Sequence, residues 1–351
     1  MWRATGAPFT FSAAACIYAL GGMGMRVLIT GVTGMAGSHL AEILCTQGHE
    51  VWGGARWRSD LSNLRAVFRC LHLCHYDLRD AASVRALVTA SHPEAVFHLA
   101  AQSYVPASWT APAETMETNV VGEVHLMEAI RELAPLATVQ IAGSSEAYGR
   151  VEPEELPITE RQPFRPLSPY GVSKVAQELL GLQYHHAYGL RVIVTRAFNH
   201  EGPRRSALFA PSAFARQVAE MEAGLRPAVL HVGNLDAVRD WTDVRDVVRG
   251  YALAVIHGRP GEVYNIASGV GRRISELVDI LRLEALVPFT VEVDPQRLRP
   301  ADVPRLVGDA SAFRAATGWA PQIDFHQTVV DLLDWWRERV HSPAEPGGIG
   351  A

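Results

Sequence analysis

The sequence is almost free of lysine. Arginine supplies 31 of the 32 basic residues in the 351-residue chain, and Lys174 is the single lysine. The formal net charge is −5, so the chain lacks the global positive field that would favour nucleic-acid binding. Because a compact ammonium is kept at one position only, Lys174 is a candidate functional residue.

Cysteine and long apolar runs are also scarce. Four cysteines are too few for a disulfide framework in a chain of this length and indicate a reducing, cytoplasmic setting. Cys70, His72 and Cys74 alternate without any common zinc spacing, so we predict a strand there and no metal site. No apolar run reaches the roughly 18 residues that span a bilayer, so we expect no membrane segment.

Strands and helices alternate in the pattern that follows. We expect strands at Val27–Thr30, Glu50–Ala55, Leu71–Tyr76, Ala95–Ala100 and Val139–Gly143. We expect helices at Ser38–Gln47, Ala81–Ala90, Glu114–Leu133, Ser212–Ala223, Val244–Ile256, Ile274–Leu283 and His326–Val340. Such alternation predicts an α/β fold with a doubly wound, Rossmann-type parallel sheet and helices on both faces.

A glycine-rich turn follows the first expected strand. Gly31, Gly34 and Gly37 form a G-x-x-G-x-x-G pattern that leads into the first helix. The first glycine permits the tight turn, the second lets backbone approach a pyrophosphate, and the third lets helix and strand pack closely. In this position between strand and helix, the pattern predicts a dinucleotide site at a helix N-terminus.

The end of the second strand indicates which dinucleotide is bound. NAD enzymes usually have an acidic residue there for the ribose 2′-hydroxyl, whereas this chain has Arg56, Arg58 and Ser59. Guanidinium groups pair with phosphate through two parallel hydrogen bonds, so these residues favour NADP over NAD. A solvated loop in which the arginines contact no ligand is the alternative.

These elements suggest a domain division. We expect residues 25–197 to form the NADP-binding domain and residues 198–343 to form a smaller substrate-binding portion that exchanges some chain with it. The first 24 residues have a mild apolar stretch like a weak signal peptide, but we interpret them as a disordered or dispensable extension, with residues 344–351 as a tail.

Tyr170 and Lys174 stand four residues apart on one expected helix face. A phenol is a poor base at neutral pH, and a neighbouring ammonium would lower its pKa. Lys174 also offers donors to a cofactor ribose. The strand before this helix ends at Ser144, Ser145 and Glu146, where ligands sit in parallel sheets. Ser144 is placed to donate to a substrate oxygen, and Glu146 is either a second catalytic carboxylate or a cap at the turn.

The combination of the glycine turn with Ser144, Tyr170 and Lys174 resembles the extended short-chain dehydrogenase/reductase superfamily. The resemblance extends from Met25 to Val340. Its more specific segments are residues 101–105 (AQSYV), 144–149 (SSEAYG), 198–205 (FNHEGPRR) and 233–241 (GNLDAVRDW). These segments resemble the GDP-mannose 4,6-dehydratases and the related GDP-6-deoxy-4-keto-mannose reductases.

The resemblance implies a set of binding residues. Cofactor contacts would come from Gly31, Thr33, Gly34, Met35, Gly37, Arg56, Arg58, Ser59, Asp77, Leu78, Leu99, Ala100, Ala101, Tyr170 and Lys174. Substrate contacts would come from Ser103, Ser145, Asn199, Arg205, Asn234, Arg239, Arg299 and Asp302. Arg239 and Arg299 would hold the nucleotide-sugar phosphates, although a structural ion pair is the alternative for each. The resemblance also implies a homodimer or homotetramer.

The two sister groups divide the motifs between them. Residues 56–59 with Asn63, the run at 199–205 and the run at 239–241 resemble the dehydratases, whereas residues 242–246 and 298–304 resemble the reductases. Residues 209–213 lack an Arg-Lys pair that dehydratases tend to carry, which leaves one substrate or phosphate contact without a counterpart. Glu146 does not decide the choice, because some reductases also carry a glutamate there.

The dehydratase resemblance implies an internal redox reaction. Tyr170, with Lys174 and Ser144, would remove the C4 hydroxyl proton while hydride passes from C4 to NADP⁺. Glu146 would then remove the C5 proton and help to expel the C6 hydroxyl as water, before the hydride returns to C6. The reductase alternative would use the tyrosine as an acid during NAD(P)H-dependent reduction of a C4 ketone to GDP-rhamnose. Another nucleotide-sugar epimerase or dehydratase remains an alternative, and so does a non-catalytic dinucleotide-binding regulator on the same fold.

Overall fold

The structure of the protein is a computed structural model that describes residues 24–297 and 303–341. The expectations for residues 1–23 and for the tail at 344–351 lie outside the described residues. Arg299 and Asp302, both expected to contact substrate, also lie outside them.

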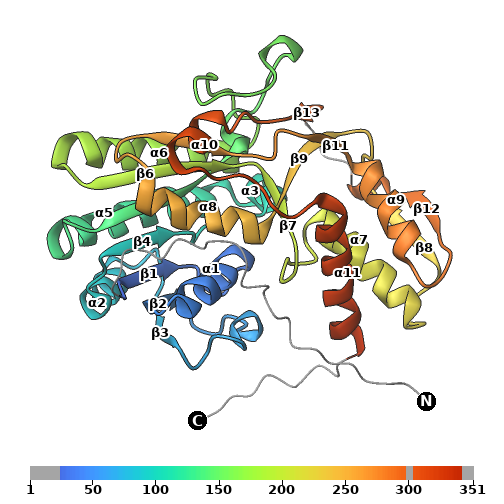
Figure 1. Cartoon of the computed structure of the whole chain (residues 1–351), viewed down its shortest axis with the longest axis horizontal. Coiled ribbons are helices and arrows are strands. Elements are labelled where there is room, and N and C mark those ends of the chain that lie inside the picture. The colour runs from blue at the N-terminus through green and yellow to red at the C-terminus, as the bar shows by residue number, and fades with distance from the viewer. Residues whose placement is uncertain (1–23, 298–302, 342–351) are drawn as a thin grey trace.

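A parallel sheet forms the centre of the molecule (Figure 1). Within the described residues it has seven strands in the order β10-β6-β5-β4-β1-β2-β3, which confirms the predicted α/β fold. Its strands are β1 (Arg26–Thr30), β2 (Glu50–Ala55), β3 (Leu71–His75), β4 (Ala95–His98), β5 (Thr138–Ser144), β6 (Arg191–Ala197) and β10 (Val263–Ile266). The strand predicted to end at Ala100 ends at His98, because the next residues turn across the tip of β1.

Helices cover both faces of this sheet, and each face has its own apolar core. On one face lie α1 (Met35–Thr46), α8 (Val244–His257) and α10 (Ser311–Thr317), and on the other lie α2 (Ala81–Ser91), α5 (Gly122–Leu133) and α6 (Pro169–Tyr188). Burial on both faces explains why the strands are apolar throughout rather than alternating. The sheet topology reverses between β1 and β4, which is where ligands bind in open α/β sheets.

The long helix expected at Glu114–Leu133 is interrupted. The chain instead forms α3 (Val105–Thr110), α4 (Pro112–Met116), a π-helical turn at Glu117–Val121 and then α5. A π turn rotates the following residues relative to an α-helix, and such turns are frequent at functional sites. Here the turn carries Asn119, whose side chain makes buried contacts at the site described below.

The second portion of the chain builds its own core beside the sheet (Figure 1). Its helices are α7 (Ala210–Glu222), α9 (Ile274–Glu284) and α11 (Phe325–His341). Its strands are β7 (Asn199–Glu201), β8 (Val229–Val232), β9 (Val238–Asp243), β11 (Gly271–Arg273), β12 (Thr290–Val293) and β13 (Arg305–Leu306). Between these elements the chain returns to the central sheet, where it forms α8 and β10. The two portions of the structure therefore exchange segments of chain.

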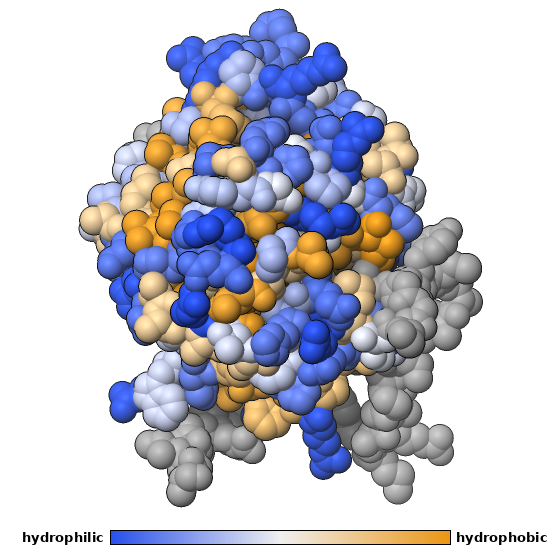
Figure 2. All heavy atoms as spheres, turned by 90° about the vertical axis from the view of Figure 1, so that its left-hand side faces the viewer, coloured by the Kyte–Doolittle hydropathy of each residue, from blue (hydrophilic) through white to orange (hydrophobic). Residues whose placement is uncertain are grey.

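The side of the molecule that carries α5 shows apolar side chains between polar ones (Figure 2). Val172 and Leu179, seven residues apart on α6, are 43% and 54% exposed, and Val121 in the adjoining π turn is 45% exposed. None of the helices in residues 24–297 and 303–341 combines the length and the hydropathy that a membrane crossing requires.

Candidate active site

The glycine turn lies at the carboxyl end of β1, against the segment that follows β4. Gly31 has a φ of +71°, and a Cβ on it would lie 2.9 Å from the Cα of Ala100. A Cβ on Gly37 would lie 2.4 Å from the Gly31 carbonyl oxygen, whereas a Cβ on Gly34 would meet that oxygen only at 3.4 Å. The first and third glycines are therefore required by the protein's own packing, whereas Gly34 faces space that a ligand can use.

This turn presents the N-terminus of α1 to that space. Gly34 is the N-cap residue and no side chain caps the helix there, and the first turn has no acidic residue. The positive end of the helix dipole is therefore available to an anion. Asn63 donates to the Thr33 carbonyl oxygen at 3.0 Å and fixes the outer part of the turn, while Met35 is buried beneath it. The arrangement fits a dinucleotide pyrophosphate.

A cavity of about 460 Å³ lies at the ends of β2 and β3. Its walls are Arg56, Trp57, Arg58, Ser59, His75, Tyr76, Asp77 and Arg79. The Asp77 carboxylate accepts hydrogen bonds from Arg79, which hold the pKa of Asp77 below its usual value. Three arginines therefore face one cavity whose carboxylate is already paired, a charge pattern that suits a phosphate-bearing ribose.

Residues 99–101 form the opposite wall of the dinucleotide space. The Thr30 hydroxyl oxygen accepts hydrogen bonds from the backbone N–H groups of Leu99 and Ala100, at 3.1 and 3.2 Å. Leu78, by contrast, is 4% exposed and packs against Gly122, so its side chain belongs to the core. The structure thus brings Leu99 and Ala100 to the tip of β1, as expected for cofactor contacts. Leu78 can reach a ligand only through its backbone.

Tyr170 and Lys174 occupy the first two turns of α6. Ser168 caps this helix by accepting a hydrogen bond from Gly171 N–H at 3.0 Å, and Pro169 provides a suitable first residue. The Lys174 ammonium donates to the Ala142 carbonyl oxygen at 2.9 Å and lies 5.9 Å from the centre of the Tyr170 ring. The tyrosine and lysine side chains thus meet at the carboxyl end of β5.

Ser144 completes this group. Its hydroxyl is hydrogen-bonded to the Tyr170 phenol, and it also accepts from Glu146 N–H at 3.2 Å. Burial raises the pKa of Tyr170 to about 12, while the Ser144 hydrogen bond and the Arg205 charge oppose that rise. The sequence predicted a lowered pKa for this phenol; that prediction is wrong for the structure as described, because burial outweighs the charges that act on Tyr170.

Glu146 lies in a short 3₁₀ turn, Ser145–Ala147, directly after β5. It lines a narrow cleft together with Trp109, Ser145 and Arg239, and its carboxylate acts electrostatically on Tyr170. Arg239 is 7% exposed and donates to the carbonyl oxygens of Val238 and Val303. The cleft therefore combines a carboxylate, a serine and a buried guanidinium next to the Tyr170 phenol.

The segment after β6 brings further polar groups to the same region. Arg205 acts electrostatically on Tyr170, and its guanidinium carbon lies 3.4 Å from the centre of the Phe209 ring. The Glu201 Oε1 atom lies 3.4 Å from Arg205 Nε, and burial raises the pKa of Glu201 to about 7. Among the described residues the Asn199 side-chain oxygen has no hydrogen-bond partner. A polar ligand in this region would give that oxygen the hydrogen-bond donor it lacks.

Two expected substrate contacts are placed less directly. Ser103 is exposed in the loop after β4, and Asn234 is exposed in the loop before β9, where its amide oxygen accepts from Asp236 N–H at 3.0 Å. Neither residue lines the two cavities described above.

Asn119 is a site-building residue that the sequence reasoning missed. Its amide donates to Ser173 Oγ at 2.9 Å and to the Gln102 carbonyl oxygen, and its oxygen accepts from Gln102 N–H at 2.7 Å. It therefore ties the 101–103 segment to the helix that carries Tyr170. The available signal was a lone asparagine in an otherwise helical run, three residues before Gly122.

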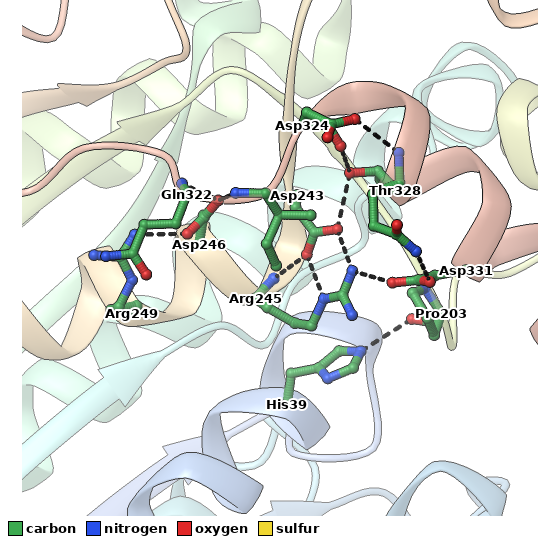
Figure 3. A network of polar contacts seen from close by, with 12 residues as sticks. His39, Pro203, Asp243, Arg245, Asp246, Arg249, Gln322, Asp324, Thr328 and Asp331 are labelled. Atoms are coloured by element: carbon green, nitrogen blue, oxygen red, sulfur yellow. Dashed lines mark hydrogen bonds and ion pairs between the residues drawn. The ribbon is translucent and has the colours of Figure 1, made fainter. Parts of the chain in front are cut away.

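Buried polar contacts join α1, the segment after β7, α8 and α11 (Figure 3). His39 on α1 contacts the Pro203 carbonyl oxygen at 3.1 Å, and burial lowers the pKa of His39 to about 3, so the ring is neutral. Asp243 caps α8, accepts from the Arg245 guanidinium and receives the Thr328 hydroxyl at 2.9 Å. The contact of His39 with Pro203 therefore ties α1 to the segment that follows Asn199, and the contact of Asp243 with Thr328 ties the end of β9 to α11.

The chain is similar to known proteins over most of its length. The family model described as GDP-mannose 4,6 dehydratase matches residues 28–332. The GDP-6-deoxy-D-mannose reductase of Pseudomonas aeruginosa is 36% identical over 318 residues, which cover 91% of this chain and 99% of that protein. GDP-mannose 4,6 dehydratase 2 of Arabidopsis thaliana is also 36% identical, over 323 residues that cover 88% of this chain and 85% of that protein.

A solved structure shows the same architecture. The structure titled RMD from Pseudomonas aeruginosa complexed with NADPH superposes with a TM-score of 0.78 at 34% identity, and the match covers 90% of this chain and 99% of that one. The fold, the glycine turn and the Ser144, Tyr170 and Lys174 group agree with this assignment. The chain is therefore a member of the GDP-mannose 4,6-dehydratase and GDP-6-deoxy-4-keto-mannose reductase group of the extended short-chain dehydrogenase/reductase superfamily, and is an NAD(P)-dependent enzyme of nucleotide-sugar modification.

Proposed function

We propose that the protein is a GDP-mannose 4,6-dehydratase that converts GDP-mannose into GDP-4-keto-6-deoxymannose with loss of water. The position of Glu146 carries this proposal. A dehydration needs a second acid–base group besides the tyrosine, and the Glu146 carboxylate lines the cleft within electrostatic reach of Tyr170.

The proposed cofactor is NADP. The Gly34 face, the uncapped N-terminus of α1 and the cavity lined by Arg56 and Arg58 fit its pyrophosphate and its 2′-phosphate. When bound, the nicotinamide supplies the redox step by accepting a hydride from the sugar C4 and returning it to C6. No net oxidation of the sugar nucleotide results.

The protein's own groups perform the proton transfers. Tyr170 reacts as its phenolate, which the Lys174 charge and the Ser144 hydrogen bond favour against the effect of burial, and this phenolate removes the C4 hydroxyl proton. Ser144 also holds the sugar oxygen. The C4 ketone acidifies the C5 proton, which Glu146 removes. Glu146 then returns that proton to the departing C6 hydroxyl, so water leaves and the carboxylate is regenerated. When the hydride is added at C6, C5 takes up one proton in exchange for the proton that Tyr170 removed from the C4 hydroxyl, so the net change is the loss of one water.

The sugar diphosphate needs cations, which this net-negative chain supplies locally. Arg239 lines the cleft from β9, and Arg205 lies near Tyr170 with its guanidinium stacked on Phe209. We propose that Arg239 contacts the diphosphate and that Asn199, with its unsatisfied oxygen, contacts a sugar hydroxyl. The roles expected of Arg299 and Asp302 remain predictions from the sequence.

A product assay tests the proposal. Purified protein is incubated with GDP-mannose and NADP⁺, and GDP-4-keto-6-deoxymannose is measured by chromatography and mass. Glu146→Gln should lose dehydration at least about 100-fold while the C4 hydrogen still exchanges with the cofactor, because only the second proton transfer is removed. Unchanged water loss in Glu146→Gln contradicts the proposed role of this residue.

A GDP-6-deoxy-4-keto-mannose reductase that makes GDP-rhamnose is the second candidate. It is favoured by the match to the Pseudomonas aeruginosa reductase over 99% of that protein. In this reaction Tyr170 donates a proton to the C4 oxygen during reduction by NAD(P)H. Consumption of NAD(P)H with the ketosugar, together with no product from GDP-mannose, would establish the reductase in place of the dehydratase.

We also infer that the protein is a homodimer or homotetramer. The exposed apolar residues Val121, Val172 and Leu179 lie on the π turn and on α6, two elements that contact each other, which supports burial of this face in an oligomer. Leu179→Arg should lower the mass measured by light scattering toward that of one chain, and an unchanged mass would place the contact elsewhere.

A further inference from the structure

A buried arginine lies behind the turn that carries Glu146 and takes no part in the chemistry above. Arg196 on β6 is 4% exposed, and it pairs with the Glu178 carboxylate on α6, which is 3% exposed. The pairing is bidentate, because Arg196 Nε donates to Glu178 Oε2 at 2.7 Å and Nη2 donates to Oε1. A buried ion pair adds little net stability, since both charges lose their water, so stability alone does not account for it.

The third nitrogen of the guanidinium reaches the turn that carries Glu146. Arg196 Nη1 donates to the Tyr148 hydroxyl oxygen at 2.7 Å, and the guanidinium carbon lies 4.9 Å from the centre of the Tyr148 ring. Tyr148 is fully buried and ends the 3₁₀ turn after β5, where its backbone N–H donates to the Ser145 carbonyl oxygen at 3.1 Å. One side chain on β6 thus contacts both α6 and the turn.

The hydrogen bonds around the Tyr148 hydroxyl fix its orientation. An arginine can only donate, so the phenol oxygen accepts from Arg196, and the phenol proton goes to Asn265 Oδ1 on β10 at 2.6 Å. The Asn265 amide nitrogen donates to the carbonyl oxygens of Ile158 and Asp309, at 2.9 and 3.2 Å, which sets the end of the amide that faces the phenol. The hydroxyl therefore accepts once and donates once, and this leaves it one orientation.

The helix α6 also touches the Glu146 turn directly. A Cβ on Gly171 would lie 2.7 Å from the Glu146 carbonyl oxygen, so the backbones of helix and turn meet at the residue after Tyr170. The Ser144 hydroxyl, which is hydrogen-bonded to Tyr170, accepts from Glu146 N–H. These contacts hold the start of the turn near the helix, whereas the guanidinium of Arg196 holds its end.

We propose that Arg196 is a positioning residue that holds the turn bearing Glu146 against the helix bearing Tyr170. Its two anchor points are the Glu178 carboxylate on α6 and the Tyr148 hydroxyl at the end of the turn. This role rests on the proposed dehydration, because that reaction needs the phenol and the carboxylate to act in sequence on one sugar. Geometry matters there, since a displacement of about 1 Å can cost about 100-fold in rate.

Tyr148→Phe tests the link with the smallest change. It removes one hydroxyl and leaves both the aromatic ring and the pair of Arg196 with Glu178 in place. Tyr184→Phe is the matched control, because the Tyr184 hydroxyl is also on α6 but donates to Glu128 on α5 at 2.8 Å. The fold of each variant is checked by circular dichroism, and each is assayed well below its Tm.

The first measurement is how the reaction divides between its two halves. With GDP-mannose and NADP⁺, oxidation at C4 forms reduced cofactor, and the return of hydride after water loss consumes it. In Tyr148→Phe, water loss should slow at least about tenfold while C4 oxidation stays within about twofold of the parent, so reduced cofactor accumulates. Tyr184→Phe should change neither rate. Equal rates of water loss in the two variants overturn the proposal, and so does an equal fall in both halves, which lost stability alone would cause.

Hydrogen exchange separates this inference from the proposed function. A parent that forms no GDP-4-keto-6-deoxymannose refutes the proposed function, and the anchoring of the turn is then judged by exchange alone. The peptide that spans residues 144–149 should exchange its amide hydrogens at least about tenfold faster in Tyr148→Phe than in the parent or in Tyr184→Phe. Unchanged exchange of this peptide overturns the proposal whichever reaction the enzyme catalyses. If Tyr148→Phe does not fold, Glu178→Gln weakens the other anchor point and is judged by the same criteria.

Discussion

The glycine turn permits a paired prediction that separates folding from cofactor binding. Gly37→Ala places a Cβ 2.4 Å from the Gly31 carbonyl oxygen and 2.8 Å from the Val32 Cα, both backbone atoms. Since Cβ atoms do not approach closer than 3.0 Å, α1 and the turn must separate by roughly 0.6 Å. Overpacking of this kind costs about 1–3 kcal/mol. At about 2–4 °C for each kcal/mol in a chain of this size class, Tm should fall by several degrees.

Gly34→Ala is the matched variant in the same turn. Its new Cβ meets the Gly31 oxygen at 3.4 Å, and the Gly34 backbone is extended (φ −69°, ψ 169°), so alanine fits without strain. Tm should stay within about 1 °C of the parent. The Cβ instead occupies the space proposed for the pyrophosphate, so the Kd for NADP⁺ should rise at least about tenfold, or 1.4 kcal/mol.

Circular dichroism melts and titration calorimetry with NADP⁺ measure the two effects separately. Equal losses of stability in the two variants would refute the packing argument. An unchanged Kd in Gly34→Ala would refute the placement of the pyrophosphate.

Three further predictions concern charge. Lys174→Arg should lower kcat at least about 100-fold, while circular dichroism shows an intact fold. The reason is that a planar guanidinium cannot take the place of the compact ammonium that donates to the Ala142 carbonyl oxygen. Turnover close to that of the parent would contradict this. Arg56→Ala should raise the KM for NADP⁺ about tenfold or more and change that for NAD⁺ little, whereas the exposed control Arg69→Ala should change neither. Glu201 keeps its proton in the folded state up to a pKa of about 7, whereas the unfolded chain releases it near 4.5, so stability should fall by about 3 kcal/mol as pH rises through that range. Glu201→Gln should abolish that part of the pH dependence, as denaturant titrations at both ends of the range can show.

The strands and the glycine turn could be predicted because their signals are local. The strand at Glu50–Ala55 has the predicted bounds, since an apolar run ends there at exposed arginines. The break at Glu117–Val121 could not be predicted, because the π turn depends on contacts of Asn119 with Gln102 and Ser173, which are distant in sequence.

The same distinction applies to the site. Ser144, Tyr170 and Lys174 follow from strand ends and helix spacing, and the structure brings them together. Glu123 on α5 is fully buried, with a carboxylate oxygen 3.8 Å from His98 Nε2 of β4, and no spacing in the sequence reveals this contact. The pKa of Tyr170 was predicted in the wrong direction for a related reason, since burial of the phenol depends on the whole fold.

The buried single lysine also makes the chain a reporter of its own unfolding. An endoprotease that cuts only after lysine has one target bond, between Lys174 and Val175, in the second turn of α6. The native helix protects that bond, and the unfolded chain yields fragments of 174 and 177 residues. The cut separates β5 from its neighbour β6, so one proteolytic event divides the central sheet. The rate of appearance of two nearly equal fragments would therefore measure global opening of the enzyme without any label or engineered site.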